Sequence, residues 1–178
     1  MRYTLEHAYR NTDIHQHLVT LHNLVCAMGA KLVLELGVRG GESTVALLEA
    51  VGETGGKLVS VDMGGCEGTL EMLRNYGIAN RLEFHKSDDI EFGTKVWDRS
   101  KLFDLVFIDT SHEYQHTKRE IEVFEPITRP GGVMVFHDTV SYQDGVMRPL
   151  QEFLAIHKNY TFEHHPNCHG LGIIRKPA

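Results

Sequence analysis

"LVLELGVRGGEST", residues 32–44, decides the fold. An apolar run with strand character, Leu32–Leu36, leads into a turn that contains Gly37, Gly40 and Gly41, and a helical segment follows. Glycine lets the backbone of such a turn approach a ligand closely, and the free N–H groups that begin the helix can bind it. The spacing is not the G-x-G-x-x-G of dinucleotide-binding proteins. The stretch nevertheless predicts a strand, a ligand-binding turn and a helix in succession.

Four further apolar runs alternate with segments of helical periodicity; they are Leu58–Val61, Leu82–Phe84, Phe103–Ile108 and Val133–Phe136. Continuously apolar strands that alternate with helices are typical of a parallel sheet covered on both faces. Near the end, "YTFEHH" and "GLGIIRK" read as two strands joined by the turn-rich "PNCHG". The pattern predicts an α/β fold with a Rossmann-like, doubly wound, mostly parallel sheet and an antiparallel C-terminal hairpin.

Residues 1–29 form an expected N-terminal helical segment. Four apolar residues fall on one helical stripe there: Ile14, Leu18, Leu21 and Val25. Thr12 or Asp13 can cap this helix, and Gly29 can end it. Downstream, Pro149 is expected to open a last helix, because proline is tolerated in a first turn.

Length, charge and cysteine content limit the class of protein. The 178 residues fit one domain, spanning 1–178, and no repeat or linker divides them. The net charge is −6 and no block of Lys or Arg occurs, which argues against nucleic acid or an anionic membrane as a partner. Three separated cysteines without a C-x-x-C motif indicate reduced thiols. No signal peptide is evident and no apolar run approaches the ~20 residues of a membrane span, so we expect a cytoplasmic protein.

Polar residues flank the glycine turn and end the next strand. Glu35 lies where a carboxylate could face a ligand ammonium group, and Ser43 can hydrogen-bond in the first helical turn. "VSVDM" ends in Asp62, and an acid at the end of the second strand commonly binds ribose hydroxyls. The alternative for Asp62 is a helix cap.

A third strand leads into "HKSDD", which places Ser87 and Asp88 where the base of a nucleoside would lie. Asp88 or Asp89 can alternatively cap the following helix. A glycine turn, an acid and this polar pair on successive strands together favour a ligand of the nucleoside type.

Two later strands each end in an acid and an imidazole. "VFIDTSHEY", residues 106–114, delivers Asp109 and His112, and "GGVMVFHDT" delivers His137 and Asp138. Ligands of open α/β sheets bind beyond the carboxyl ends of the strands, and carboxylates from two neighbouring ends can converge on a divalent cation. The alternative for Asp109 is to cap the helix that begins near Glu113.

"HHPNCHG" suggests a zinc site, because it contains four potential ligands: His164, His165, Cys168 and His169. The segment lacks a paired C-x-x-C and lies at a hairpin tip. We therefore interpret it as turn chemistry.

The motifs "ELGVRGGES", "VDM", "KSDD", "FIDTSHEY" and "FHDT" follow one another over most of the chain. In this order the sequence resembles class I S-adenosylmethionine-dependent methyltransferases. It is most similar to the small metal-dependent O-methyltransferase branch, with catechol-type, macrolide-sugar and cephalosporin-hydroxylase-like relatives. The resemblance implies a seven-stranded sheet whose last strand is antiparallel. No NPPY-like tetrapeptide of nucleic-acid amino-methylating enzymes occurs.

The resemblance also implies how the cofactor is bound. The residues implied around its methionine part are Glu35, Gly37, Arg39, Gly41 and Ser43. Asp62 and Met63 are implied at the ribose, Ser87 and Asp88 beside the adenine, and Asp109 also at the cofactor.

A metal site and a base are implied in the same way. Asp109, His137 and Asp138 are the implied ligands of Mg²⁺. Because His137 stands where the family usually has an acid, a transition metal is an open alternative. His112 takes the place of a basic lysine in catechol-type enzymes, and an imidazole suits a general base near neutral pH. Two alternatives stay open: His137 is the base, or His112 is only a pocket wall.

The resulting functional hypothesis is O-methylation of a small-molecule hydroxyl, with S-adenosylmethionine and a divalent metal. Alternatives are a metal-dependent hydroxylase-like or hydrolytic enzyme on the same scaffold, and a non-catalytic cofactor-binding module. The acceptor itself is not determined, because acceptor contacts come from variable loops. A domain this short has an open site or closes it with a second subunit, so a homodimer is a further hypothesis.

Overall fold

A computed structural model describes all residues, 1–178. One seven-stranded sheet forms the centre, in the order β3-β2-β1-β4-β5-β7-β6. Its strands are β1 Leu32–Leu36, β2 Lys57–Asp62, β3 Leu82–Lys86, β4 Phe103–Ile108, β5 Thr128–His137, β6 Thr161–His165 and β7 Leu171–Arg175. The strands β1 to β5 are parallel, whereas β7 is antiparallel to both β5 and β6. The predicted sheet and terminal hairpin are confirmed.

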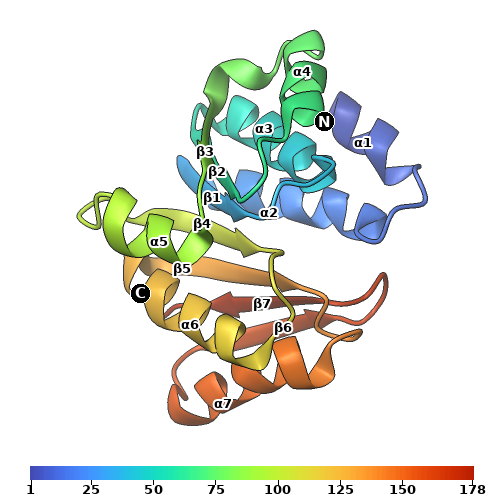
Figure 1. Cartoon of the computed structure of the whole chain (residues 1–178). Coiled ribbons are helices and arrows are strands. Elements are labelled where there is room, and N and C mark those ends of the chain that lie inside the picture. The colour runs from blue at the N-terminus through green and yellow to red at the C-terminus, as the bar shows by residue number, and fades with distance from the viewer.

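Seven α-helices cover the sheet: α1 Arg2–Ala8, α2 Leu18–Met28, α3 Glu42–Thr54, α4 Glu67–Asn75, α5 Asp89–Glu91, α6 Tyr114–Phe124 and α7 Arg148–Ile156. Figure 1 shows α1 to α4 on one side of the sheet and α5 to α7 on the other. None of these helices combines the length and apolar character needed to cross a bilayer.

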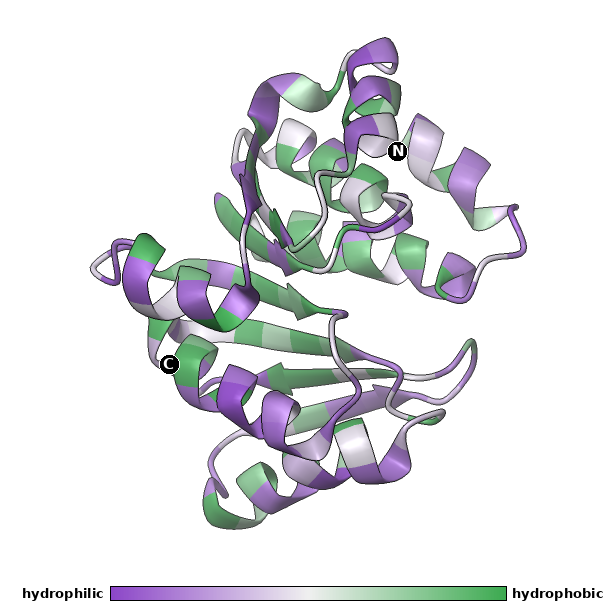
Figure 2. Cartoon of the chain, in the orientation of Figure 1, coloured by the Kyte–Doolittle hydropathy of each residue, from purple (hydrophilic) through white to green (hydrophobic).

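The core has two halves because successive strand residues point to opposite faces. On the side of α2 and α3, one apolar cluster contains Val33 and Phe107; on the side of α6 and α7, the other contains Leu34 and Val106. All four of these side chains are fully buried, and the central strands are the most hydrophobic part of the cartoon (Figure 2). The continuously apolar strands therefore serve both cores.

The helix α2 begins at Leu18, later than the expected cap at Thr12 or Asp13 indicated. A 3₁₀ turn, His15–His17, precedes α2, and neither Thr12 nor Asp13 caps a helix. Asp13 instead forms an ion pair with Arg39 in the glycine turn. The apolar stripe from Ile14 to Val25 is buried as predicted, and Gly29 ends α2 in the left-handed conformation with φ 58°. The side chain of Asp13, which could have capped the helix locally, thus binds a residue distant in sequence.

The order in which strands are added to the sheet reverses between β1 and β4. These two strands are neighbours, although the chain forms β2 and β3 between them. The turn after β1 and the turn after β4 meet at this point. A Cβ on Gly37, whose φ is +88°, would lie 2.0 Å from the backbone oxygen of Asp109. Only glycine allows these two backbones to approach so closely. The crevice expected at a topological switch point begins here.

Candidate active site

A cavity of about 380 Å³ lies beyond the carboxyl ends of β1, β2, β3 and β4, a volume in the range of small-molecule sites. Its lining includes Gly37, Arg39, Asp62, Met63, Ser87, Asp89, Asp109 and His116. Six of these were expected at a cofactor from the sequence, and the fold brings them together from four different strand ends.

Asp62 ties the end of β2 to the glycine turn. Its Oδ2 accepts hydrogen bonds from the backbone N–H groups of Val38 at 2.8 Å and Arg39 at 3.1 Å, and its Oδ1 accepts from Gly64 at 2.7 Å. Burial opposes ionisation, but these N–H donors outweigh it and lower the pKa of Asp62. The carboxylate is therefore charged and held at the cavity wall.

Glu35 does not reach the cavity, contrary to the expectation that it faces a ligand ammonium. Its side chain is fully buried and accepts hydrogen bonds from the hydroxyls of Ser43 at 2.6 Å, Thr44 at 3.1 Å and Ser60 at 2.6 Å. Burial raises the pKa of Glu35 to about 7, although the three hydroxyls act against it. The residue fastens β1 to β2 and to the start of α3.

Three other residues expected at the cofactor lie elsewhere. Asp88 caps α5 by accepting a hydrogen bond from the Glu91 N–H at 2.8 Å, so the alternative prediction for it is confirmed, and Asp89 lines the cavity instead. Gly41 packs against α4, where a Cβ would lie 2.4 Å from Thr69. Ser43 borders a smaller adjoining cavity of about 90 Å³ that Ile14 and His112 also line.

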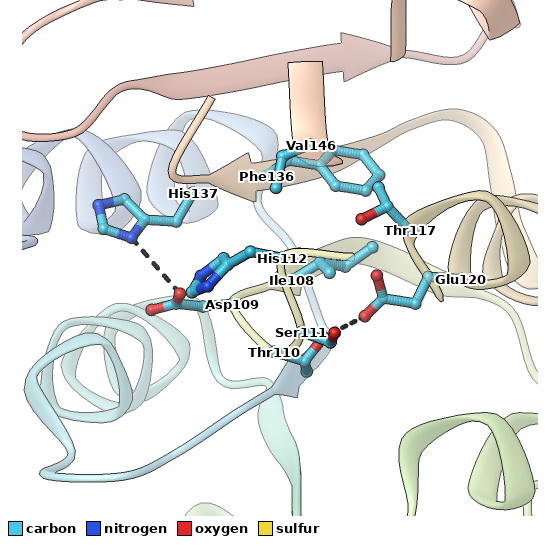
Figure 3. A pocket seen from close by; sticks show the side chains of 10 residues that line it. All are labelled: Ile108, Asp109, Thr110, Ser111, His112, Thr117, Glu120, Phe136, His137 and Val146. Atoms are coloured by element: carbon cyan, nitrogen blue, oxygen red, sulfur yellow. Dashed lines mark hydrogen bonds and ion pairs between the residues drawn. The ribbon is translucent and has the colours of Figure 1, made fainter. Parts of the chain in front are cut away.

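Asp109, His137 and Asp138 converge at the ends of β4 and β5. One ligand atom from each lies within 4.8 Å of the others. Nδ1 of His137 is 3.4 Å from Oδ1 of Asp109 and 3.3 Å from Oδ2 of Asp138. Asp109 caps no helix, because α6 begins after Glu113 without a side-chain cap. Figure 3 shows the imidazole of His137 facing Asp109 across the site.

His137 fits a cation at this point. Its Nε2 donates to the backbone oxygen of Cys168 at 3.2 Å, which leaves Nδ1 directed at the two acids. That buried Nδ1 has no hydrogen-bond partner of good geometry. Burial alone would lower the pKa of His137, but Asp109 and Asp138 outweigh it and raise the pKa to about 10. The site therefore holds positive charge between the two carboxylates, as a proton or as a metal ion that replaces it.

Asp138 reaches this group through an uncommon backbone conformation. Two consecutive residues of a regular strand point to opposite faces. Asp138 follows the last residue of β5 with φ 63°, in the left-handed region that few non-glycine residues adopt. The twist places its carboxylate beside the imidazole of its own neighbour, His137. The left-handed conformation thus brings two consecutive side chains to one candidate site.

His112 lies against the same carboxylate. Its Nε2 is 2.7 Å from Oδ2 of Asp138, and its ring stacks on Tyr142 with 3.9 Å between ring centroids. Burial opposes ionisation of Asp138, but the imidazoles of His137 and His112 outweigh it and lower its pKa. The turn that carries His112 is packed so tightly that a Cβ on Gly145 would lie 1.8 Å from its carbonyl oxygen.

Two features of this site could not be found from the sequence. The Cys168 carbonyl and the His116 imidazole both come from regions with no strand-end motif. Cys168 and His169 adopt positive φ in the hairpin turn, and no metal-ligand group forms from the "HHPNCHG" segment. Only the turn interpretation of that segment agrees with the geometry.

Comparison with known proteins identifies the fold and the family. Residues 34–139, from β1 to just past β5, match a family described as a methyltransferase domain. The chain belongs to that family. The matched segment contains the glycine turn, Asp62 and the Asp109–His137–Asp138 group, so this methyltransferase domain includes the strand-end residues of the candidate site.

Two curated relatives match more weakly. A Sinorhizobium fredii protein, y4gI, whose name gives it no function, is 28% identical over 166 residues, which are 85% of this chain and 18% of that protein. An Arabidopsis thaliana protein provisionally named as a caffeoyl-CoA O-methyltransferase is 25% identical over 142 residues, 76% of this chain and 60% of that protein. The chain thus spans less than two thirds of either relative.

Solved structures share the fold. The O-methyltransferase TomG from Streptomyces achromogenes, solved with S-adenosylmethionine, has a TM-score of 0.78 at 22% identity and covers 92% of this chain and 81% of its own. An O-methyltransferase from Bacillus cereus, in complex with S-adenosylhomocysteine, has a TM-score of 0.74 at 18% identity, with 90% and 80% covered. The class I methyltransferase fold predicted from the sequence is confirmed.

Proposed function

We propose that this methyltransferase-domain protein transfers a methyl group from S-adenosylmethionine to a hydroxyl group of a small molecule. The observation that carries the proposal is the position of Asp109, which lies both on the wall of the 380 Å³ cavity and in the group formed with His137 and Asp138. A nucleoside-bearing donor in the cavity would therefore lie beside the acid–imidazole group that prepares the acceptor.

Different residues of the cavity contact different parts of the cofactor. Asp62 and Met63 bind the ribose, and Ser87 lies beside the adenine together with Asp89 rather than Asp88. Gly37 and Arg39 lie nearest the methionine part, where free backbone at the turn supplies close approach. Glu35 acts indirectly, by holding Ser43 and the first turn of α3 in place.

The chemistry of the donor set fits a divalent metal held by Asp109, His137 and Asp138. When bound, such an ion would lower the pKa of the acceptor hydroxyl. Carboxylate oxygens suit Mg²⁺, whereas the buried Nδ1 of His137 favours a first-row transition metal.

His112 is the proposed base. Both nitrogens of His137 are engaged, one by Cys168 and the other by the two acids. His112 is about one third exposed and borders the smaller cavity beside Ser43. Asp138 next to its Nε2 leaves Nδ1 as the basic atom, and the Tyr142 ring fixes the plane of the imidazole.

In the transfer step the acceptor oxygen forms a bond to the methyl carbon as the bond from that carbon to sulfur breaks. Sulfur keeps the electron pair, the donor leaves as S-adenosylhomocysteine, and the hydroxyl proton moves to Nδ1 of His112. Positioning the two reactants in line can contribute about 7–11 kcal/mol, and the base about 10²–10⁴-fold.

Calorimetric titration with S-adenosylhomocysteine tests the cofactor assignment, with Asp62→Asn as the variant expected to weaken binding. Formation of S-adenosylhomocysteine with a panel of catechols and simple phenols, with and without a chelator, tests the reaction. No binding at millimolar ligand would overturn the proposal. Turnover that depends on the metal and ignores the cofactor would favour a hydroxylase-like or hydrolytic enzyme instead.

The partners belong to the same proposal. The acidic net charge and the absence of a basic cluster support a small-molecule acceptor rather than a nucleic acid, and the scarce, separated cysteines support the cytoplasm. The homodimer stays a prediction from the short length of the domain.

A further inference from the structure

A second group of one imidazole and two acids lies on the far wall of the cofactor cavity. Asp89 begins α5, while His116 and Glu120 lie one turn apart on α6. One ligand atom of each lies within 4.8 Å of the other two. Nε2 of His116 is 3.1 Å from Oδ2 of Asp89 and 3.7 Å from Oε1 of Glu120. Of the three residues only Asp89 has a role in the proposed methyl transfer, beside the adenine, and neither His116 nor Glu120 takes part in it.

The charges of this group are not balanced by the protein. The side chains of Asp89 and Glu120 are 9% and 1% exposed, and their only cationic neighbour within ion-pair distance is His116. Thr110 donates a hydrogen bond to Oε1 of Glu120, as Figure 3 shows, but the buried Oε2 has no partner. Burial and the nearby Asp89 carboxylate raise the pKa of Glu120 well above its ordinary value. A buried acid without a donor on one oxygen calls for a proton or a cation.

The geometry suits a metal ion. In octahedral coordination, ligand atoms about 2.1 Å from an ion lie about 3.0 Å apart when adjacent and about 4.2 Å apart when opposite. The distances from Nε2 of His116 to the two carboxylate oxygens, 3.1 and 3.7 Å, lie between these values. The donors come from two helices, so their positions are fixed by the fold. Asp89 and His116 both line the 380 Å³ cavity, which gives an ion a path to the group.

We propose that Asp89, His116 and Glu120 form a second divalent-cation site, distinct from the group at Asp138 and selective for first-row transition metals. An imidazole with two carboxylates is the ligand set of such ions. The ion takes the place of the proton that the two acids otherwise share. It neutralises the buried charges and fixes α6 against α5 at the cavity wall.

Mn²⁺ is the probe, counted by electron paramagnetic resonance of the free ion during titration. It suits oxygen and imidazole ligands and avoids the thiol of a third, more exposed group, His22, Cys26 and Glu53. His116→Gln removes a ligand whose side chain is 26% exposed, and it should weaken binding at this site by more than about 100-fold, since even outer partners contribute about 10–100-fold. His85→Gln is the control, because His85 is similarly exposed and lies 2.9 Å from a single carboxylate, Glu83.

The expected result is that wild type and His85→Gln bind one more Mn²⁺ per chain than His116→Gln. Asp138→Asn should lose a different ion, and the double variant should lose both. Asp89→Asn should reproduce His116→Gln, and circular dichroism shows that each variant is folded. Equal Mn²⁺ binding by wild type and His116→Gln would overturn the inference. Loss in His116→Gln without loss in Asp138→Asn would support it and count against the metal at the proposed active site.

Discussion

Glu35 and Asp138 are both buried carboxylates near the carboxyl ends of central strands, yet their protonation differs. Glu35 is surrounded by three hydroxyls, and burial raises its pKa to about 7. Asp138 touches the imidazoles of His112 and His137, and its pKa is lowered. Neutral donors hold an acid in place without keeping it charged, whereas imidazoles keep it ionised. This difference separates the acid that supports the fold from the acid proposed for chemistry.

The largest expected effect comes from Asp138→Asn. The change removes a proposed metal ligand and the partner of His112, so kcat/KM for methyl transfer should fall at least about 10³-fold, the combined scale of a lost base and a weakened metal. Binding of S-adenosylhomocysteine should persist, because Asp138 does not line the larger cavity. Asp144→Asn, an exposed neighbour, is the control. Full activity of Asp138→Asn would show that Asp138, like Glu35, has no part in the chemistry.

His112→Gln tests the base alone. Glutamine keeps a polar side chain beside Asp138 but cannot accept a proton near neutral pH, so kcat should fall about 10²–10⁴-fold with little change in KM. Steady-state kinetics measure this, with the exposed His157→Gln as the control. If KM rises and kcat does not change, His112 is a binding wall instead of a base.

Glu35→Gln should change the pH dependence of stability. The pKa of Glu35 rises from 4.5 to about 7 on folding, so the folded state binds the extra proton and wild-type stability falls as pH rises through this window. Relative to wild type, Glu35→Gln should therefore gain about 2–3 kcal/mol between pH 5 and 8. Urea unfolding across this range measures the difference.

The control for Glu35→Gln is the exposed Glu71→Gln, whose stability should run parallel to wild type over the same pH range. A parallel curve for Glu35→Gln as well would mean that Glu35 is ionised in the folded protein. The contrast with Asp138 would then disappear.

The smallest effect is expected from Asp13→Asn, on thermal stability. Its ion pair with Arg39 joins side chains that are 36% and 76% exposed, and such surface pairs contribute about 0–1 kcal/mol. Thermal unfolding should shift slightly at low salt, and the shift should vanish at high salt because screening weakens exposed pairs. A larger loss would show that the N-terminal segment around Asp13 depends on this pair.

The strand-end motifs were recoverable from the sequence because each one is local. Asp62, Asp109 and Asp138 each end or follow an apolar run, and such runs form the strands of a sheet that is buried on both faces. Because these strands are parallel, the three acids lie at the same edge of the sheet. The sequence-based prediction for Glu35 was wrong because Glu35 lies one residue before the end of β1. Strand side chains alternate between the two faces of the sheet, so that of Glu35 points into the protein interior, toward α3. Asp88 and Asp89 were indistinguishable in sequence, and the start of α5 decided between capping and the cavity.

The sequence by itself determined the order of strands and helices, the glycine turn and the acids that end neighbouring strands, because periodicity and turn chemistry act over a few residues. Only the tertiary structure decided which of these acids are charged. That depends on donors distant in sequence, such as Ser60 beside Glu35 and the Cys168 carbonyl behind His137. It also brought His116 and Glu120 to Asp89, because packing α6 against α5 joins side chains that no local pattern connects.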